Sequence, residues 1–386
     1  MSGKSQLTNE LKQHAYNCGI DLIGITTPES FPRYISELET RKFMYQERYG
    51  TRMEQWIKMA QPSELLPNAK SLIVIGFYYL TDDCLDQSKP GDPHGIIGRV
   101  ILHGHLGIVK GMIKIISFLK ERKFNVVAGV HRKEAVVRSG LGFIGKNTLA
   151  INRKFGSYVA YQCLVTDAAL ECDSSTTIES CEDCDECLKA CPTKAIYAPY
   201  KLDPRKCLTY LLTHPDIPTD LLDKTENSIL GCDRCEQACP KNKGLVPKTN
   251  LECAFPPPIH VSPSLVPFLE MEEEYFQNEI IKVTFAKFSL GEITRSDEMV
   301  PETFIFAGNK RRLYQRNALL ALAFAKDEKT IPAIVKVLDG RDYFLRFYAA
   351  WALSKMKYNE EAERALQEAL QKEPDEAFRR QLQEFI

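Results

Sequence analysis

Eight of the thirteen cysteines lie between positions 181 and 239, and their spacing is the clearest chemical signal in the sequence. One run reads Cys-x-x-Cys-x-x-Cys-x-x-x-Cys-Pro, and a second, altered copy follows in which the first cysteine lies far upstream. The first group is Cys181, Cys184, Cys187 and Cys191, and the second is Cys207, Cys232, Cys235 and Cys239. Clustered thiols without a secretion signal indicate metal binding rather than disulfides.

The spacing predicts two [4Fe–4S] clusters. In two-cluster ferredoxins the fourth cysteine of such a run ligates the other cluster. By this crossed rule, cluster 1 takes Cys181, Cys184, Cys187 and Cys239, and cluster 2 takes Cys191, Cys207, Cys232 and Cys235. Two tetrahedral zinc sites are the alternative, although zinc motifs seldom double this spacing with a proline after each last cysteine. The cysteine-rich segment is therefore predicted to transfer electrons.

The elements that must position these thiols fall into three parts. Residues 1–170 alternate between helical and strand patterns and predict an α/β (α+β) domain with a central sheet. The expected strands are residues 21–26, 71–80, 124–130 and 158–166, and the expected helices are 5–18, 36–60 and 109–120. Residues 171–255 form the ferredoxin-like module. Residues 256–386 begin with three prolines and continue with amphipathic helices, which indicates a HEAT-like repeat domain or an ordinary helical bundle.

Charge and hydropathy argue against a broadly basic protein and against a membrane-spanning one. The 50 basic and 51 acidic residues give a formal charge of −1, so any anionic partner must find a local basic patch. The longest apolar stretch, residues 72–80, is much shorter than the roughly 20 residues of a membrane-spanning helix. The polar N-terminus lacks a signal-peptide core. We therefore expect a cytoplasmic protein without a membrane segment.

A glycine-rich stretch at residues 140–147 (GLGFIGKN) nearly spells a phosphate-binding loop. Asn147 stands where a hydroxyl would bind magnesium, and a helical pattern precedes the loop instead of a strand. We read it as a turn whose backbone approaches a large flat ligand. Nearby His103, His105 and His131 are candidate proton donors, although a lone loop histidine is more often structural.

The order of these motifs resembles that of the epoxyqueuosine reductase family. The likeness rests on residues 66–71 (LPNAKS), 138–147 (RSGLGFIGKN) and 205–210 (RKCLTY), on both cysteine groups and on the helical tail, and it spans nearly the whole chain. The resemblance implies a cobalamin-dependent iron–sulfur reductase that converts epoxyqueuosine to queuosine in transfer RNA. Electrons would pass through the two clusters to cob(I)alamin.

The resemblance also implies cofactor-binding residues and partners. Cobalamin would lie between the α/β domain and the cluster module. Asp233 and Arg234 correspond to nucleotide-facing residues of the family's cluster loop, with Thr209 close by, and we add Lys146 and Asn147 as candidate cofactor-binding residues. An external electron donor such as ferredoxin or flavodoxin is expected, and the protein is expected to be a monomer.

The helical tail would hold the tRNA. A basic patch at its start offers contacts to phosphates, although a solvated helix start explains the same residues. The patch consists of Lys310, Arg311, Arg312 and Arg316.

The substrate side departs from the family pattern. Counting back from Arg138 without gaps, residues 126–128 (VVA) occupy the place of the family's Asp-led triplet, so its proton-donating aspartate is absent. Glu134, His105 and His131 are the candidate replacements. Two alternatives follow: a paralogous corrinoid and iron–sulfur reductase with another substrate, or a non-catalytic electron carrier.

Overall fold

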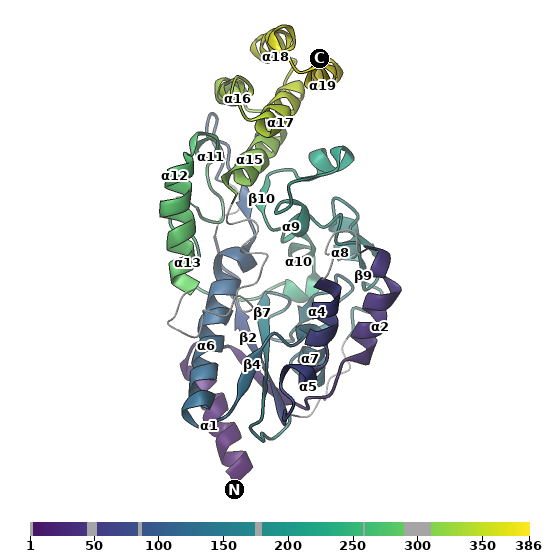
Figure 1. Ribbon diagram of the computed structural model, residues 1–386, viewed down its shortest axis with the longest axis vertical. Coiled ribbons are helices and arrows are strands. Elements are labelled where there is room, and N and C mark those ends of the chain that lie inside the picture. Colours follow the sequence, from purple (N-terminus) through teal and green to yellow (C-terminus); the bar gives the residue numbers. More distant parts are fainter. Residues whose placement is uncertain (1–2, 45–51, 84–86, 174–179, 258, 289–309) are drawn as a thin grey trace.

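The computed structural model describes residues 3–44, 52–83, 87–173, 180–257, 259–288 and 310–386. The molecule is elongated, with the sheet domain at one end, the helical repeats at the other and the cysteine-rich segment between them (Figure 1). Part of the helix expected at residues 36–60 lies outside the described residues, as does the third proline of the linker.

A four-stranded sheet in the order β1-β2-β7-β4 forms the centre of the first domain. Every pairing in it is antiparallel, so the domain is of the α+β type. The strands are β1 (Leu22–Thr26), β2 (Ser71–Tyr78), β7 (Val159–Thr166) and β4 (Val126–Ala128). β7 is buried along its whole length because helices cover both faces of the sheet, and β2 is almost as buried, as the apolar run at residues 72–80 predicts.

Helices pack on both faces of this sheet (Figure 1). One face carries α1 (Gly3–Asn17) and α6 (His105–Glu121), and α7 (Arg132–Arg138) packs on the other, near α2 (Pro32–Thr40), α4 (Arg52–Met59) and α5 (Pro62–Leu65). A π-helical turn, η1 (Val100–Gly104), leads into α6. Residues 100–121 are long and apolar enough to cross a membrane, but 67% of the tested window is buried inside the protein, as in a core helix.

The cysteine-rich segment is built from short elements joined by turns. Its strands are β8 (Ile196–Ala198), β9 (Lys201–Leu202) and β10 (Ser228–Leu230), and its helices are α8 (Glu186–Ala190), α9 (Leu208–Leu211), η2 (Thr219–Lys224), α10 (Arg234–Gln237) and η3 (Pro240–Asn242). β10 pairs in parallel with β3 (Ile96–Ile97), which ties the segment to the first domain. A small hairpin of β5 (Phe143–Ile144) and β6 (Ala150–Ile151) lies beside it.

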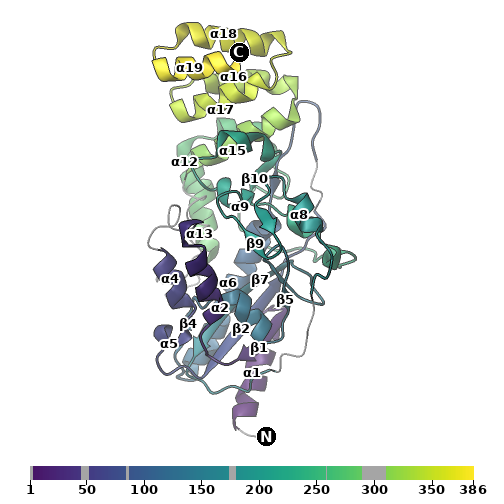
Figure 2. The same ribbon diagram turned by 90° about the vertical axis from the view of Figure 1, so that its right-hand side faces the viewer.

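Stacked helices form the C-terminal part, as the amphipathic pattern predicts (Figure 2). They are α11 (Val266–Glu270), α12 (Glu273–Tyr275), η4 (Phe276–Ile281), α13 (Lys282–Phe288), α15 (Arg311–Ala325), η6 (Glu328–Thr330), α16 (Ile331–Leu338), α17 (Tyr343–Ser354), α18 (Glu360–Lys372) and α19 (Glu376–Phe385). Asp342, Asn359 and Asp375 cap α17, α18 and α19 with their side chains. A single apolar core runs from the sheet into these helices.

One buried arginine joins the repeats to the cysteine-rich segment. The Arg316 side chain is fully buried, and its guanidinium donates to the carbonyl oxygens of Leu212 (3.1 Å), His214 (2.7 Å) and Pro215 (2.9 Å). The neighbouring Asn317 amide donates to the Leu212 oxygen as well. A guanidinium with five donors suits several carbonyl groups at once.

This arrangement corrects the expected phosphate-binding patch. Arg316 is inaccessible to phosphates, because its side chain is fully buried and donates to backbone carbonyl groups. Arg311 forms an ion pair with Glu273, and Arg312 lies over the Phe344 ring at 5.0 Å. These four basic residues therefore do not form one open surface for phosphates.

Arg316→Leu should lower the free energy of unfolding by at least about 3 kcal/mol, because several buried carbonyl groups lose their donor and each costs about 1–3 kcal/mol. Denaturant unfolding of the full chain measures the change. Arg312→Leu, on the exposed side of the same helix, is the matched control and should change stability little. Equal stability of the two variants would contradict the docking role of Arg316.

Candidate functional site

The first set of predicted cluster ligands gathers at one end of the cysteine-rich segment. Burial, followed by the negative charges of Cys181 and Cys239, raises the pKa of Cys187 to about 11. Burial also raises the pKa of Cys239, and the negative charges of Cys181 and Cys184 raise it further. The fold therefore brings Cys239 beside the first run rather than beside its own neighbours in sequence.

The second set gathers around α9 and α10 and is more enclosed. Burial raises the pKa of Cys207, and the charge of Cys191 raises it further. Burial, together with Glu236 and the thiols Cys232 and Cys207, raises the pKa of Cys235 well above its usual value. Four thiols packed this closely cannot all ionise unless cationic metal compensates them.

Either an iron–sulfur cluster or a zinc ion would use these thiolates as ligands. A zinc ion takes four ligands around one centre, whereas a cubane distributes four thiolates over four iron atoms. The cysteine spacing, with a proline after the last cysteine of each run, is what favours iron–sulfur clusters over zinc.

The glycine-rich stretch runs between the two sets. The backbone N–H of Lys146 donates to the Cys181 sulfur at 3.4 Å, and its ammonium donates to the Glu182 carbonyl oxygen at 2.6 Å. The Asn147 side chain donates to the Cys235 carbonyl oxygen at 3.5 Å. The candidate cofactor residues Lys146 and Asn147 therefore contact both cysteine sets.

Two more candidate cofactor residues are engaged close to cluster 2. The backbone and hydroxyl of Thr209 hydrogen-bond to Cys207 and lower the pKa of that thiol, against the larger effect of burial. Arg234 pairs with Glu226 at 2.5 Å and donates to the Ser228 hydroxyl at 2.9 Å. Both residues support the cysteine loops directly.

Asp233 belongs to a buried polar group that sequence reasoning found only in part. One of its carboxylate oxygens accepts the backbone N–H of Arg99 at 3.0 Å, and the other is buried without a hydrogen-bond partner. Glu236, on the same short helix, accepts the Tyr79 hydroxyl at 3.0 Å. Burial raises the pKa of both carboxyl groups, and the charge of Asp233 raises that of Glu236 further. Glu236 was missed, and its place directly after a cluster cysteine was the available signal.

Two cations begin α7, and one of them, Lys133, lies near the second cysteine set. Both side chains are exposed at the surface, and partial desolvation by the surrounding protein lowers the pKa of both, that of Lys133 to about 8. The charges of Cys207 and Cys235 act on Lys133 in the opposite direction, as expected of a lysine near these thiols.

The three candidate proton donors lie in different surroundings. Burial and the charge of Arg132 lower the pKa of His105 to about 4. His131 stacks on Tyr34 at 3.5 Å between ring centroids, and burial lowers its pKa to about 3. Both imidazoles are therefore neutral at pH 7. Burial raises the pKa of the half-buried Glu134, which favours its protonated form.

The residues that a gap-free count places opposite the family's aspartate are part of the sheet. Val126 and Val127 pair with Thr166 and Val165 in β4 and β7. Neither residue carries an ionisable group, so these two positions supply no acid.

The chemistry of this region fits cobalamin. A corrinoid is a large, flat ligand with amide side chains and one phosphodiester, and it needs an electron source close by. Arg132 and Lys133 offer cations at the start of α7, and Lys133 lies near the second cysteine set, which would hold cluster 2. Asp233, in the loop of that set, has a buried carboxylate oxygen without a hydrogen-bond partner.

Known proteins share these features. The family of 4Fe-4S double cluster binding domains matches residues 180–242, and HEAT repeats match residues 306–385. Epoxyqueuosine reductase from Bacillus cereus is 32% identical over 96% of this chain and 94% of its own length. The Bacillus subtilis protein of that name is 30% identical over 99% of this chain and 95% of its own.

Solved structures agree with this likeness. In one structure of the Bacillus subtilis epoxyqueuosine reductase, an aspartate-bearing catalytic loop is swung out of the active site. It matches with a TM-score of 0.82 and 27% identity over 99% of this chain and 98% of that one. Another epoxyqueuosine reductase, crystallised with an epoxyqueuosine-modified tRNA-Tyr stem loop, matches with a TM-score of 0.80, 27% identity and the same coverage. The chain belongs to the epoxyqueuosine reductase family and is an oxidoreductase whose cofactors are two [4Fe–4S] clusters and cobalamin.

Proposed function

We propose that this protein reduces epoxyqueuosine to queuosine in tRNA, in the cytoplasm, as a monomer supplied by an external donor such as ferredoxin or flavodoxin. The observation that carries the proposal is the pair of crossed cysteine sets, the second of which lies near Lys133 at the start of α7. Bound cobalamin supplies a strongly reducing metal centre. Residues 1–170, 171–255 and 256–386 act as corrinoid-binding, cluster and tRNA-holding parts.

Within this function, Glu134 is the residue that delivers a proton. Removal of an epoxide oxygen requires an acid for the departing oxygen. Among the three candidates, Glu134 has a pKa raised by burial, whereas His105 and His131 hold no proton to spare at neutral pH. The Glu134 carboxyl group takes over the task of the missing aspartate.

A second candidate function is reduction of a different substrate by the same machinery. It is favoured by Val126 and Val127, which pair within the sheet at the family's aspartate position. The clusters and cobalamin are the same in both proposals, and only the substrate that is reduced differs.

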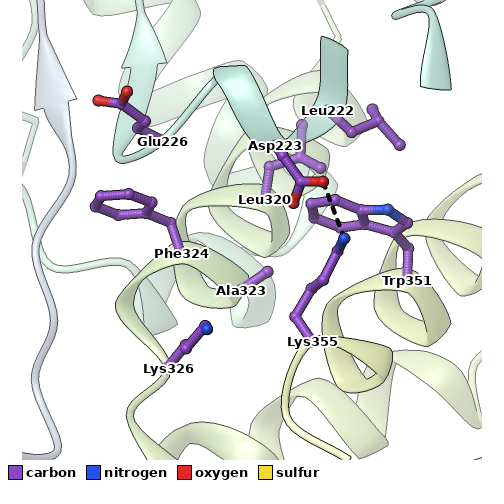
Figure 3. A pocket seen from close by; sticks show the side chains of 9 residues that line it. All are labelled: Leu222, Asp223, Glu226, Leu320, Ala323, Phe324, Lys326, Trp351 and Lys355. Atoms are coloured by element: carbon purple, nitrogen blue, oxygen red, sulfur yellow. Dashed lines mark hydrogen bonds and ion pairs between the residues drawn. The ribbon is translucent and has the colours of Figure 1, made fainter. Parts of the chain in front are cut away.

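The helical repeats supply a surface for tRNA. A pocket of about 510 Å³ lies where α15 and α17 meet η2 of the cluster module (Figure 3). Lys355 pairs with Asp223 across it at 2.9 Å, and the Phe324 ring at its rim is 53% exposed. Lys326 also lines the pocket. An exposed ring beside a lysine suits base stacking combined with a phosphate contact.

Queuosine content of tRNA tests the function. Deletion of the gene should abolish queuosine and lead to accumulation of its epoxide, and expression of the intact chain should restore queuosine. Unchanged queuosine in the deletion strain would remove the proposal and favour the second candidate.

Cys184→Ala should remove cluster 1 and turnover while cluster 2 remains. Anaerobically purified protein should fall from about eight iron atoms per chain to about four, since each cubane holds four. Iron analysis and the brown absorbance measure the loss. Cys253→Ala is the control, because Cys253 contacts the Ile259 carbonyl group and belongs to neither set. Full iron in the Cys184 variant would contradict the ligand assignment.

Glu134→Gln should slow single-turnover reduction by about 10²-fold or more, in the range of general acid catalysis. Cluster and cobalamin content should be unchanged. Glu64→Gln, an exposed change in the same domain, should have no effect. A Glu134 variant with the normal rate would show that another group provides the proton.

Phe324→Ala should weaken tRNA binding about tenfold, in line with about 1–3 kcal/mol for stacking of one base. Binding of unmodified tRNA measured by fluorescence anisotropy is the readout. The exposed Tyr197, on the cluster module, provides the matched control as Tyr197→Ala. Equal affinity of both variants would exclude this pocket from the tRNA surface.

A further inference from the structure

Lys133 is a cation without an anionic partner in the described part of the chain. It lies in the first turn of α7, and the nearest polar contact of its ammonium is the Thr148 hydroxyl at 3.4 Å. Neither Lys133 nor the adjacent Arg132 has a carboxylate within ion-pair distance among the described residues; Arg132 donates only to the Tyr161 carbonyl oxygen, at 3.4 Å. A negative charge close to such a cation stabilises it.

The compensating charge lies at the second cysteine set. Thr148 directly follows Asn147, whose amide contacts the Cys235 carbonyl group, so the Lys133 ammonium borders this cysteine loop. Desolvation and the charges of Arg132 and Arg41 lower the pKa of Lys133. The charges of Cys207 and Cys235 act in the opposite direction and favour the protonated lysine. With its pKa at about 8, Lys133 is mostly charged at pH 7.

The lysines beside cluster 1 are arranged differently. Lys189 pairs with Asp185 at 2.8 Å and with Glu186 at 3.1 Å. The Lys146 ammonium binds the Glu182 carbonyl oxygen. Near cluster 2, the charge of Arg234 is met by Glu226. Lys133 is therefore a cation near cluster 2 whose charge no carboxylate of the described residues meets.

Four thiolates give an oxidised [4Fe–4S]²⁺ centre a net charge of about −2, and reduction by one electron makes it about −3. Burial disfavours the more highly charged reduced state, and a nearby cation favours it. We propose that Lys133 raises the reduction potential of cluster 2 and so offsets the burial of its ligands. The inference rests on the second cysteine set and not on the identity of the substrate.

Redox titration of the anaerobically purified full chain, followed by electron paramagnetic resonance, tests the role. Lys133→Met should shift the midpoint potential of cluster 2 to a more negative value and leave that of cluster 1 in place. Lys133→Arg should keep the original midpoint, because the charge is restored. Lys189→Met, which removes a lysine beside cluster 1, should leave cluster 2 unchanged. Cys184→Ala protein identifies which signal belongs to cluster 2.

An unchanged cluster 2 midpoint in Lys133→Met, or an equal shift of both clusters, would overturn the proposal. Iron content and unfolding curves show whether the variants assemble. Should Lys133→Met lose cluster 2, Lys133→Gln is titrated in its place, and it must show the same negative shift. No tRNA enters these measurements, so their failure is distinct from failure of the proposed reaction.

Discussion

The confinement of eight thiols within one short segment is the constraint on which the rest of the structure depends. Burial and mutual repulsion raise the pKa of Cys187, Cys207 and Cys235, so the thiolates that bind iron are unstable without metal. Short helices and turns hold them in place, because few regular elements fit between ligands so closely spaced. The glycine-rich stretch and the start of α7 supply N–H groups and positive charge at the edges of these sets.

The surrounding parts serve this segment in different ways. The antiparallel sheet provides a base on which α7 packs with Arg132 and Lys133 in its first turn. The repeats extend from the cysteine-rich segment to the end of the molecule opposite the sheet domain (Figure 2). Residues 126–128 are strand β4, which pairs with β7 in the sheet.

Much of this organisation was predictable from the sequence because its signals are local. The spacing of Cys181, Cys184 and Cys187 indicates a cluster without any structure, and the crossed place of Cys239 follows from the same motif. The apolar run at residues 72–80, which forms most of β2, indicates a buried strand. These features depend on residues close together in the chain.

Contacts between distant segments were not predictable. The sequence predicts that Arg316 is an exposed cation at the start of a helix. In the structure it is buried, and its guanidinium donates to four carbonyl groups of residues 211–215. Lys146 and Asn147 contact the cysteine loops as well, and these contacts are not visible in the sequence. Nothing local marked Lys133, and the position of Glu236 after Cys235 did not reveal its buried contact with Tyr79.

The placement of Arg316 couples the cysteine-rich segment to the helical repeats. Cys207 immediately precedes α9, and the end of α9 presents the Leu211 and Leu212 carbonyl groups that hold this arginine. The loop that carries a cluster ligand and the anchor of the repeat stack are therefore one piece of backbone. Because Arg316 lies in α15, a shift of the backbone at Cys207 would reach that helix as well.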